Sequence, residues 1–326
     1  AVICLLSLVV TKPILTAMNT PAAQFGDAYR YIIVILCTVA VPMIYNLEAT
    51  ILRSVGDSKT PLYFLIFASI MNIILDWVFM KNLDMGVTGA AIATVVSQLT
   101  ASLLCLIVIK KNFPVLHITK SDFARDKKLT SDMLSAGMTM ATMNSIFSIG
   151  SIIMQGAINA LGETIIAAHL ASRKLAEMFM QPLVTVGLAC STFVSQNFGA
   201  KKYDRIAKAI RYSLIYCAVW SVISFFVLWF LGAKATVLIT GTGNAEVVRN
   251  TAMYLRINAP FYFVLGILFV LRFSIQSINR KIPPLISSAM ELGTKIAAAF
   301  VFIPMWKYTG ACIAEPLSWC MGAIYL

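Results

Sequence analysis

The chain has 326 residues, of which 59% are hydrophobic and only 12% are charged, and its mean hydropathy is +0.83. A soluble globular domain of this length does not need so much apolar sequence, so the composition predicts a polytopic membrane protein. The net charge of +12 invites a nucleic-acid interpretation, but the basic clusters contain almost no aromatic residues, and we expect no nucleic-acid binding.

Apolar runs long enough to cross a bilayer, which takes about 20 helical residues, recur along the whole chain. The runs are continuous rather than alternating, and this pattern predicts helices. The fold class is therefore predicted to be an all-α polytopic membrane protein. Ten spans are predicted, the first and last incomplete, at residues 1–18, 28–52, 61–80, 85–109, 132–161, 164–196, 206–232, 250–279, 284–304 and 310–326.

Lysines and arginines gather in alternate loops between these spans, as the positive-inside rule expects. The basic loops lie near residues 53–59, 110–131, 201–211 and 280–281 and are predicted to be cytoplasmic. The loops between them hold few basic residues. The whole chain is thus predicted to be a multi-pass protein of a lipid bilayer.

Motifs for cofactor or metal chemistry are missing from the sequence. The seven cysteines show no paired spacing, and neither His117 nor His169 belongs to an H-E-x-x-H helix. No phosphate-binding glycine loop is present either, so we expect no cofactor and no ATP hydrolysis. The first residue is an alanine inside an apolar run that has no basic segment before it, and this start does not resemble a signal peptide.

An internal repeat relates the two ends of the chain. A shift of 223 residues pairs Ser54 with Ser277 and Pro61 with Pro284, and a two-residue adjustment aligns "TGAAIATVVS" at 88–97 with "TGACIAEPLS" at 309–318. Matching spans are six helices apart, so the two halves are predicted to have the same orientation.

The repeat predicts two pseudo-symmetric six-helix bundles. About ten of twelve helices are present, and two are expected to be missing from the front of the chain. The predicted domains are an N-terminal lobe at 1–109, a cytoplasmic linker between the lobes at 110–131, and a C-terminal lobe at 132–326 with its last helix cut short.

A charge inside a bilayer costs a few kcal/mol at least, so each charged residue of a span should face protein or water. Asn72 and Asp76 are spaced i, i+4 and project from one face of their helix, and Thr94 lies at a similar depth in the next span. Oxygen ligands of this kind suit a proton or Na⁺. The alternative is an aspartate that only joins helices by hydrogen bonds. The other charged candidates are Glu48, Arg173, Lys174, Glu177, Arg256, Arg272, Glu291, Lys295 and Glu315.

The second half of the repeat carries different residues at the equivalent positions. Lys295 stands opposite Asn72, and Glu315 stands opposite Thr94. Glu291 with Lys295, and Lys174 with Glu177, have the spacing of salt bridges within one helix. Alternatively these residues line a substrate cavity, in which Glu177, Glu291 or Glu315 would attract a cationic compound.

Five stretches of the sequence resemble the multidrug and toxic compound extrusion (MATE) transporters: "LRSVGDSKTPL", "MNIILDWVF", "MGVTGAAIATVVSQ", "QPLVTVGLACSTFVSQNFGAKKYDR" and "YLRINAP". The resemblance extends from the family's third helix into its twelfth. It implies two lobes with a central cavity, export coupled to H⁺ or Na⁺, and an ion site at Asn72, Asp76 and Thr94. A further aspartate of the family site lies on a first helix that this chain lacks.

These observations together favour a secondary-active antiporter in a prokaryotic inner membrane. It would act as a monomer and export small amphipathic, cationic compounds in exchange for H⁺ or for Na⁺ bound at Asp76, Asn72 and Thr94. A flippase for a lipid-linked precursor or polysaccharide is the alternative within transport, and it would need a strongly cationic cavity. An enzyme would need a catalytic pair near the midplane, for example a second aspartate beside Asp76, and none is evident in the sequence.

Overall fold

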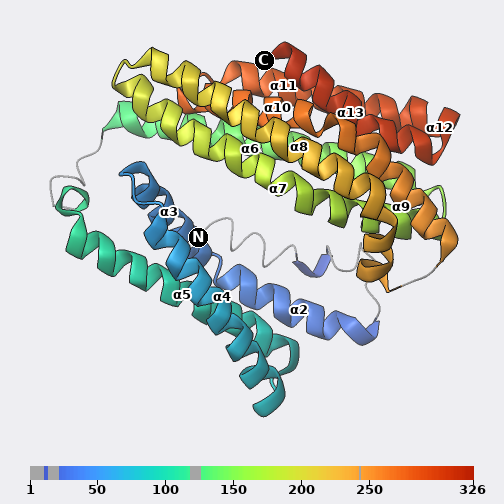
Figure 1. Ribbon diagram of the computed structural model, residues 1–326. Helices are drawn as coiled ribbons and strands as arrows, with labels where there is room; N and C mark the ends of the chain where they lie inside the picture. The colour runs from blue at the N-terminus through green and yellow to red at the C-terminus, as the bar shows by residue number, and fades with distance from the viewer. Residues whose placement is uncertain (1–10, 14–21, 118–125, 242–243) are drawn as a thin grey trace. The chain divides into compact units, whose positions relative to one another are not determined.

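The computed structural model describes residues 11–13, 22–117, 126–241 and 244–326. Within this part of the chain every regular element is a helix (Figure 1), so the prediction of an all-α fold is confirmed. The chain divides into two compact units, unit 1 at residues 1–124 and unit 2 at residues 125–326. The division falls inside the predicted linker 110–131.

Unit 1 is built around one helix, α5, which contacts α2, α3 and α4. Small buried residues of α5, Ala101 and Cys105, pack in one core with Tyr45 and Leu52 of α3. Inside a bilayer the hydrophobic effect does not drive helices together, and small residues let the helices approach closely and pack. The elements are α2 (Ala22–Cys37), α3 (Ala40–Ser54), α4 (Lys59–Trp77), the π-helix η1 (Val78–Asn82), α5 (Gly86–Asn112) and the 3₁₀ turn η2 (Pro114–Leu116).

Unit 2 has a larger core, in which α7 packs against α8, α9 and α10, and α11 packs against α6 and α13. Its largest fully buried side chains include Tyr254, Tyr262 and Leu183. The elements are α6 (Lys127–Asn159), α7 (Glu163–Gly199), α8 (Tyr203–Thr240), α9 (Ala245–Asn258), η4 (Ala259–Phe261), α10 (Tyr262–Ser277), α11 (Ile282–Ala297), the π-helix η5 (Ala298–Phe302), α12 (Ile303–Trp306) and α13 (Tyr308–Tyr325).

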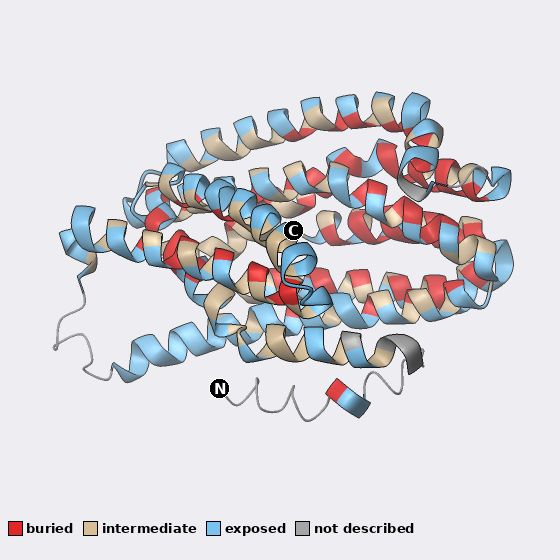
Figure 2. Ribbon diagram, turned by 90° about the horizontal axis from the view of Figure 1, so that it is seen from below, coloured by how far each residue is buried: buried red, intermediate tan, exposed pale blue. Residues whose placement is uncertain are grey.

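Large apolar side chains are exposed along many helices. On α4, Ile73 and Trp77 are 69% and 57% exposed. Figure 2 shows pale blue, exposed residues along most helices. Most of the buried hydrophobic residues belong to unit 2. A water-soluble monomer rarely exposes apolar patches of this extent, so these faces are suited to contact with lipid.

Seven helices among the described residues are long and apolar enough to cross a membrane, or up to eight if α2 and α3 form one span with a bend of 46°. Ten spans had been predicted. The predicted span at 1–18 falls almost entirely outside the described residues. The span at 310–326 is present as α13 but is not among the seven, because polar residues such as Glu315 lower its hydropathy.

The internal repeat is visible in the order of the elements. The helices α2, α3, α4 and α5 correspond to α9, α10, α11 and α13, and each unit has a π-helix where the third helix of this set ends. Gly89 and Gly310, which the repeat pairs, both pack against this segment. A Cβ atom on Gly89 would lie 3.0 Å from the Cβ of Phe79, and one on Gly310 would overlap the backbone of Phe302.

Candidate functional site

The first candidate site lies on α4 and α5 in unit 1. The side-chain amide of Asn72 donates a hydrogen bond to the Thr94 hydroxyl at 3.4 Å, and this hydroxyl donates to the Ala90 carbonyl at 3.0 Å. Asp76 is half-buried one turn beyond Asn72 on the same face of α4. Its Oδ1 atom is buried and has no hydrogen-bond partner among the described residues.

The turn between the two helices sets this alignment. The π-helix η1 begins two residues after Asp76, and its Phe79 carbonyl accepts a hydrogen bond from the Met85 amide at 3.0 Å. Gly89 then packs directly on Phe79. Because α5 starts this close to the end of α4, Thr94 comes level with Asn72. π-Helical segments inside α-helices are frequently found at functional sites.

The chemistry of the three side chains is that of a site for a hard cation. A carboxylate, an amide and a hydroxyl all offer oxygen atoms as ligands. Hard cations such as H⁺ and Na⁺ bind to oxygen, whereas softer metals prefer nitrogen or sulfur. No group of three or more His, Cys, Asp or Glu residues that could hold a metal ion occurs in the described part of the chain. The site therefore has one carboxylate and two neutral groups.

The second candidate site is a cavity of about 540 Å³ inside unit 2. Side chains of α6, α7, α10, α11 and α13 line it, and its apolar wall contains methionine and aromatic residues such as Met143, Phe147 and Trp319. Flexible methionines and flat rings suit an apolar ligand of variable shape. The cavity has a size in the range of small-molecule sites.

Charged side chains on one part of this cavity are joined into pairs. Oε1 of Glu315 lies 3.2 Å from Arg173 and 3.4 Å from Lys295, and Arg173 also pairs with Glu177 at 3.1 Å. Arg272 pairs with Glu291 and donates to the Ser287 hydroxyl at 2.9 Å. These three cations and three carboxylates sum to zero charge.

These pairs differ from the ones expected from sequence spacing. Glu291 and Lys295 do not pair with each other on α11, and Lys174 does not pair with Glu177 on α7. Instead, Lys295 reaches across to Glu315 on α13 and lies 4.4 Å from the centre of the Phe147 ring, which also attracts its charge. In a bilayer a buried charge gains most from the closest opposite charge, whichever helix carries it.

Four of the five predicted cavity residues line the cavity, namely Glu177, Glu291, Lys295 and Glu315. Lys174 is exposed and does not line it, because it follows Arg173 by one position and therefore points to another face of α7. Arg173 and Arg272 had been noted only as charged residues within spans. The i, i+4 spacing of Arg173 and Glu177 could have indicated their pair, whereas Glu315 and Glu291, the other partners of these arginines, lie on other helices and could not be found from spacing.

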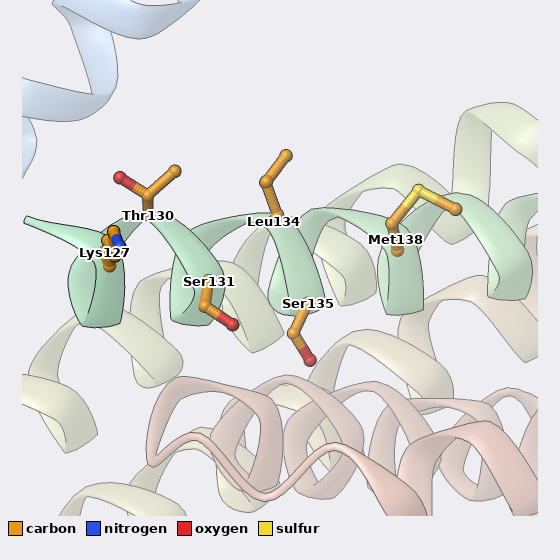
Figure 3. A pocket seen from close by; sticks show the side chains of 6 residues that line it. All are labelled: Lys127, Thr130, Ser131, Leu134, Ser135 and Met138. Atoms are coloured by element: carbon orange, nitrogen blue, oxygen red, sulfur yellow. The ribbon is translucent and has the colours of Figure 1, made fainter. Parts of the chain in front are cut away.

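A third hollow, shown in Figure 3, has a volume of about 380 Å³ and lies beside the first turns of α6. Its six lining residues, Lys127, Thr130, Ser131, Leu134, Ser135 and Met138, all come from this one helix and are all exposed. A hollow with one wall encloses no ligand, so we assign no role to it.

The helical fold, the lipid-facing surface and the two internal polar sites define a multi-pass membrane transporter. The model of the family MatE matches residues 1–78 and 139–301, which is most of the chain, and the chain belongs to this family. The family is one of transporters and not of enzymes.

Individual relatives agree with this assignment. The probable multidrug resistance protein YoeA of Bacillus subtilis is 28% identical over 217 residues, which cover 64% of this chain and 47% of that protein. YpnP of the same organism, also a probable multidrug resistance protein, is 26% identical over 259 residues, or 79% of this chain and 57% of that protein. The chain thus spans about half the length of these curated relatives.

The fold itself is that of solved MATE transporters. An outward-facing conformation of a multidrug resistance MATE family transporter superposes with a TM-score of 0.92 at 20% sequence identity, over 99% of this chain and 73% of that one. An architecture predicted from hydropathy and an internal repeat is therefore confirmed as a MATE fold.

Proposed function

We propose that the transporter containing this chain is a secondary-active antiporter that exports amphipathic compounds in exchange for H⁺ or Na⁺. The coupling site is Asn72, Asp76 and Thr94. The single observation that carries this assignment is the buried Oδ1 atom of Asp76, which lacks a partner among the described residues and lies one turn from the Asn72–Thr94 contact. Buried polar atoms are almost always hydrogen-bonded, so an exception points to a transient ligand.

Binding of the ion changes the charge of Asp76. A bare carboxylate in a span must face water or a partner, whereas a protonated or Na⁺-bound one can pack against apolar helices. The two forms therefore favour different arrangements of the surrounding helices. Coupling follows if the ion and the exported compound have different affinities for those arrangements.

The cavity of unit 2 is our proposed substrate site. Its apolar wall suits the body of an amphipathic molecule, and Glu177, whose side chain is 58% exposed, offers the most accessible carboxylate to a cationic group. Glu291 and Glu315 are only 11% exposed and are held by Arg272, Arg173 and Lys295, so we assign them to the structure of the wall.

The orientation and assembly complete the proposal. The basic residues of 110–131 support a cytoplasmic position for that linker, in a protein of the inner membrane of a prokaryotic cell. The relatives named above are bacterial proteins. We propose a monomer, because each unit already contains the residues of its own site.

The test is efflux of the fluorescent cation ethidium from cells that produce the full-length transporter. The variant Asp76→Asn is compared with the parent under imposed pH and Na⁺ gradients. Asp84→Asn makes the same chemical change in an exposed loop, where the positive φ of 48° is one that asparagine also tolerates. We expect Asp76→Asn to lose gradient-driven efflux and Asp84→Asn to keep it.

Normal pumping by Asp76→Asn would show that Asp76 is not the coupling residue. If the parent pumps no dye at all although it reaches the membrane, the drug-export proposal fails. Movement of a fluorescent lipid-linked sugar phosphate between leaflets is then the next measurement, since a flippase is the alternative within transport.

A further inference from the structure

A stripe of polar side chains runs along α5 on the face that meets α3 and α4. Thr94, Gln98 and Ser102 follow one another at i, i+4 and i+8, so they lie on one face and span about 12 Å of helix. At one end Thr94 accepts from Asn72 at 3.4 Å. At the other end the Ser102 hydroxyl donates to Oε2 of Glu48, on α3, at 2.9 Å.

Three buried oxygen atoms along this stripe have no hydrogen-bond partner among the described residues. They are Oδ1 of Asp76, Oε1 of Gln98 and Oε1 of Glu48. They lie on three helices, Asp76 on α4, Gln98 on α5 and Glu48 on α3. The Asn72–Thr94 and Ser102–Glu48 hydrogen bonds join the two ends of the stripe to α4 and α3. Unpaired polar atoms between two carboxyl groups are what a path for protons requires.

Glu48 is buried more deeply than Asp76 and has no charged partner. It is 4% exposed, and no lysine or arginine of the described residues forms an ion pair with it. The groups facing it from α5 are Ser102 and the Cys105 thiol. A carboxylate in this setting would be a bare charge inside a bilayer, so the neutral acid, which carries a proton, is the cheaper form to bury.

Other titratable groups near Glu48 are already engaged. The Tyr45 hydroxyl, one turn before it on α3, donates to the Pro61 carbonyl of α4 at 3.0 Å. Arg53 lies near the end of α3 and donates to Thr50 at 3.3 Å. Asp57, in the following loop, accepts from the Thr60 amide at 3.0 Å. None of them neutralises Glu48.

The position of Glu48 gives the path a direction. Glu48 precedes the end of α3 at Ser54 by about 9 Å of helix, whereas Asp76 lies about 26 Å along α4 from its start at Lys59. Arg53 and Lys59 flank the loop between these helices, which is predicted to be cytoplasmic. Glu48 therefore lies on the cytoplasmic side of Asp76.

Unit 2 shows that the stripe is not a general requirement of the fold. The internal repeat places Trp319 at the position of Gln98, Ala323 at that of Ser102 and Leu271 at that of Glu48. The equivalent helices pack without any of the three polar side chains. A structural need for them would apply to both units.

We propose that Glu48 is a second protonation site, which receives the proton from Asp76 and releases it toward the cytoplasm. The inference rests on the proposed function and names H⁺ as the coupling ion. In each cycle the neutral Glu48 acid releases its proton to water at the loop 55–58, and the resulting carboxylate takes up the proton that the Asp76 carboxyl gives up, so that Glu48 is neutral again and Asp76 is a carboxylate. Gln98 and Ser102 position the transfer and are neither oxidised nor reduced.

The test uses the full-length transporter reconstituted in liposomes, with ethidium as the probe. Net transport driven by a pH gradient requires release of the proton, whereas exchange of dye against dye at equal pH does not. We expect Glu48→Gln to lower gradient-driven transport by about 100-fold, the lower end of what a positioned proton-transfer group contributes, and to leave exchange close to the parent's. Glu48→Asp keeps a carboxyl group and should retain part of the gradient-driven transport that Glu48→Gln loses. Glu163→Gln, a change at an exposed helix end, should behave as the parent.

A second measurement covers the case in which Glu48→Gln does not fold. The infrared difference spectrum between low and high pH reports the C=O stretch of protonated carboxyl groups. Ser102→Ala removes the hydroxyl that binds Glu48, so we expect one such band to shift in this variant. A spectrum that does not respond to Ser102→Ala would overturn the proposal, as would gradient-driven transport by Glu48→Gln at the parent's rate.

The outcomes separate the two proposals. If Asp76→Asn loses efflux but Glu48→Gln pumps normally, the antiporter stands and the second site falls. If only a Na⁺ gradient drives the parent, the antiporter also stands and the proton path falls. If the parent transports under neither gradient, the antiporter itself is wrong.

Discussion

Nζ of Lys295 lies 3.4 Å from Oε1 of Glu315, and the internal repeat aligns these two residues with Asn72 and Thr94, whose side chains are also 3.4 Å apart. Equivalent helices, α4 with α5 and α11 with α13, are therefore joined by a neutral pair in unit 1 and by an ion pair in unit 2. A neutral pair leaves Asp76 as the only charge of its site and free to change its charge state. An ionic pair fixes its own helices together.

The neutral pair gives the first prediction. Thr94→Val keeps the shape of the side chain and removes the hydroxyl, so Asn72 loses its partner and Asp76 loses a neighbouring oxygen. We expect gradient-driven efflux to fall by at least about tenfold, equivalent to 1.4 kcal/mol of ion binding. Thr94→Ser keeps the hydroxyl and should retain most of the activity. Equal efflux in the two variants would show that the hydroxyl has no part in coupling.

The ionic pair gives the second prediction, which concerns stability. Glu315→Gln leaves Lys295, whose side chain is 3% exposed, and Arg173 without their shared carboxylate, so we expect a loss of about 3–5 kcal/mol in the free energy of unfolding. Glu177→Gln removes the more exposed partner of Arg173 and should cost less than about 1 kcal/mol. Thermal unfolding of both proteins in detergent measures the difference. Similar midpoints for the two variants would contradict this ranking.

The glycine at the start of α13 gives the third prediction. A Cβ atom on Gly310 would overlap the backbone of Phe302 in η5, and a backbone cannot move aside as a side chain can. We expect Gly310→Ala to destabilise the protein by about 1–3 kcal/mol, the usual range for overpacking. Gly293→Ala, on α11, meets nothing within 4 Å and should be neutral or stabilising by up to about 1 kcal/mol. The yield of folded protein and its unfolding midpoint report both changes.

The loop before α4 gives a prediction on pH. Hydrogen bonding from the Thr60 side chain, with smaller contributions from the backbone amides of Thr60 and Lys59, lowers the pKa of Asp57 below its ordinary value of 3.8. The stabilisation it provides is therefore complete above pH 3.8 and is lost as the pH falls below that value toward the lower pKa of the folded state.

Asp57→Ala, which removes the carboxylate that accepts from the Thr60 amide in the first turn of α4, should lower stability at pH 7 by about 1 kcal/mol. The difference from the parent should shrink in acid, and unfolding midpoints at a series of pH values will measure it. Asp84→Asn, in another loop, provides the comparison. A difference that stays constant down to the lowest pH would show that the Asp57 charge does not matter.

Much of the fold could be predicted from the sequence because the bilayer imposes one simple rule, that apolar runs become helices. The i, i+4 spacing likewise put Asn72 and Asp76 on one face of α4, and the short turn put Thr94 opposite them. These are local relationships that a helix and a hairpin determine.

The rest depended on side-chain contacts between different helices. Spacing within α11 suggested that Glu291 pairs with Lys295. Instead Glu291 pairs with Arg272 on α10 and Lys295 pairs with Glu315 on α13, and no sequence pattern predicts these partners. Glu48 had been noted as a charge in a span, but its contact with Ser102 joins residues 54 positions apart. The π-helices η1 and η5 could not be predicted either, since no residue type marks a helix that widens by one residue in a turn.

These two π-helices also carry information about ancestry. A π-turn holds one more residue than an α-turn, so the simplest origin of each is the insertion of a single residue. Both units have the wide turn at the end of the same helix, and in both a glycine of the following helix packs against it. One insertion before the gene segment was duplicated accounts for both, whereas two separate insertions would have had to reach the same place. On this account the wide turn is older than the repeat, and the difference between the charges of unit 2 and the stripe of unit 1 arose after the duplication.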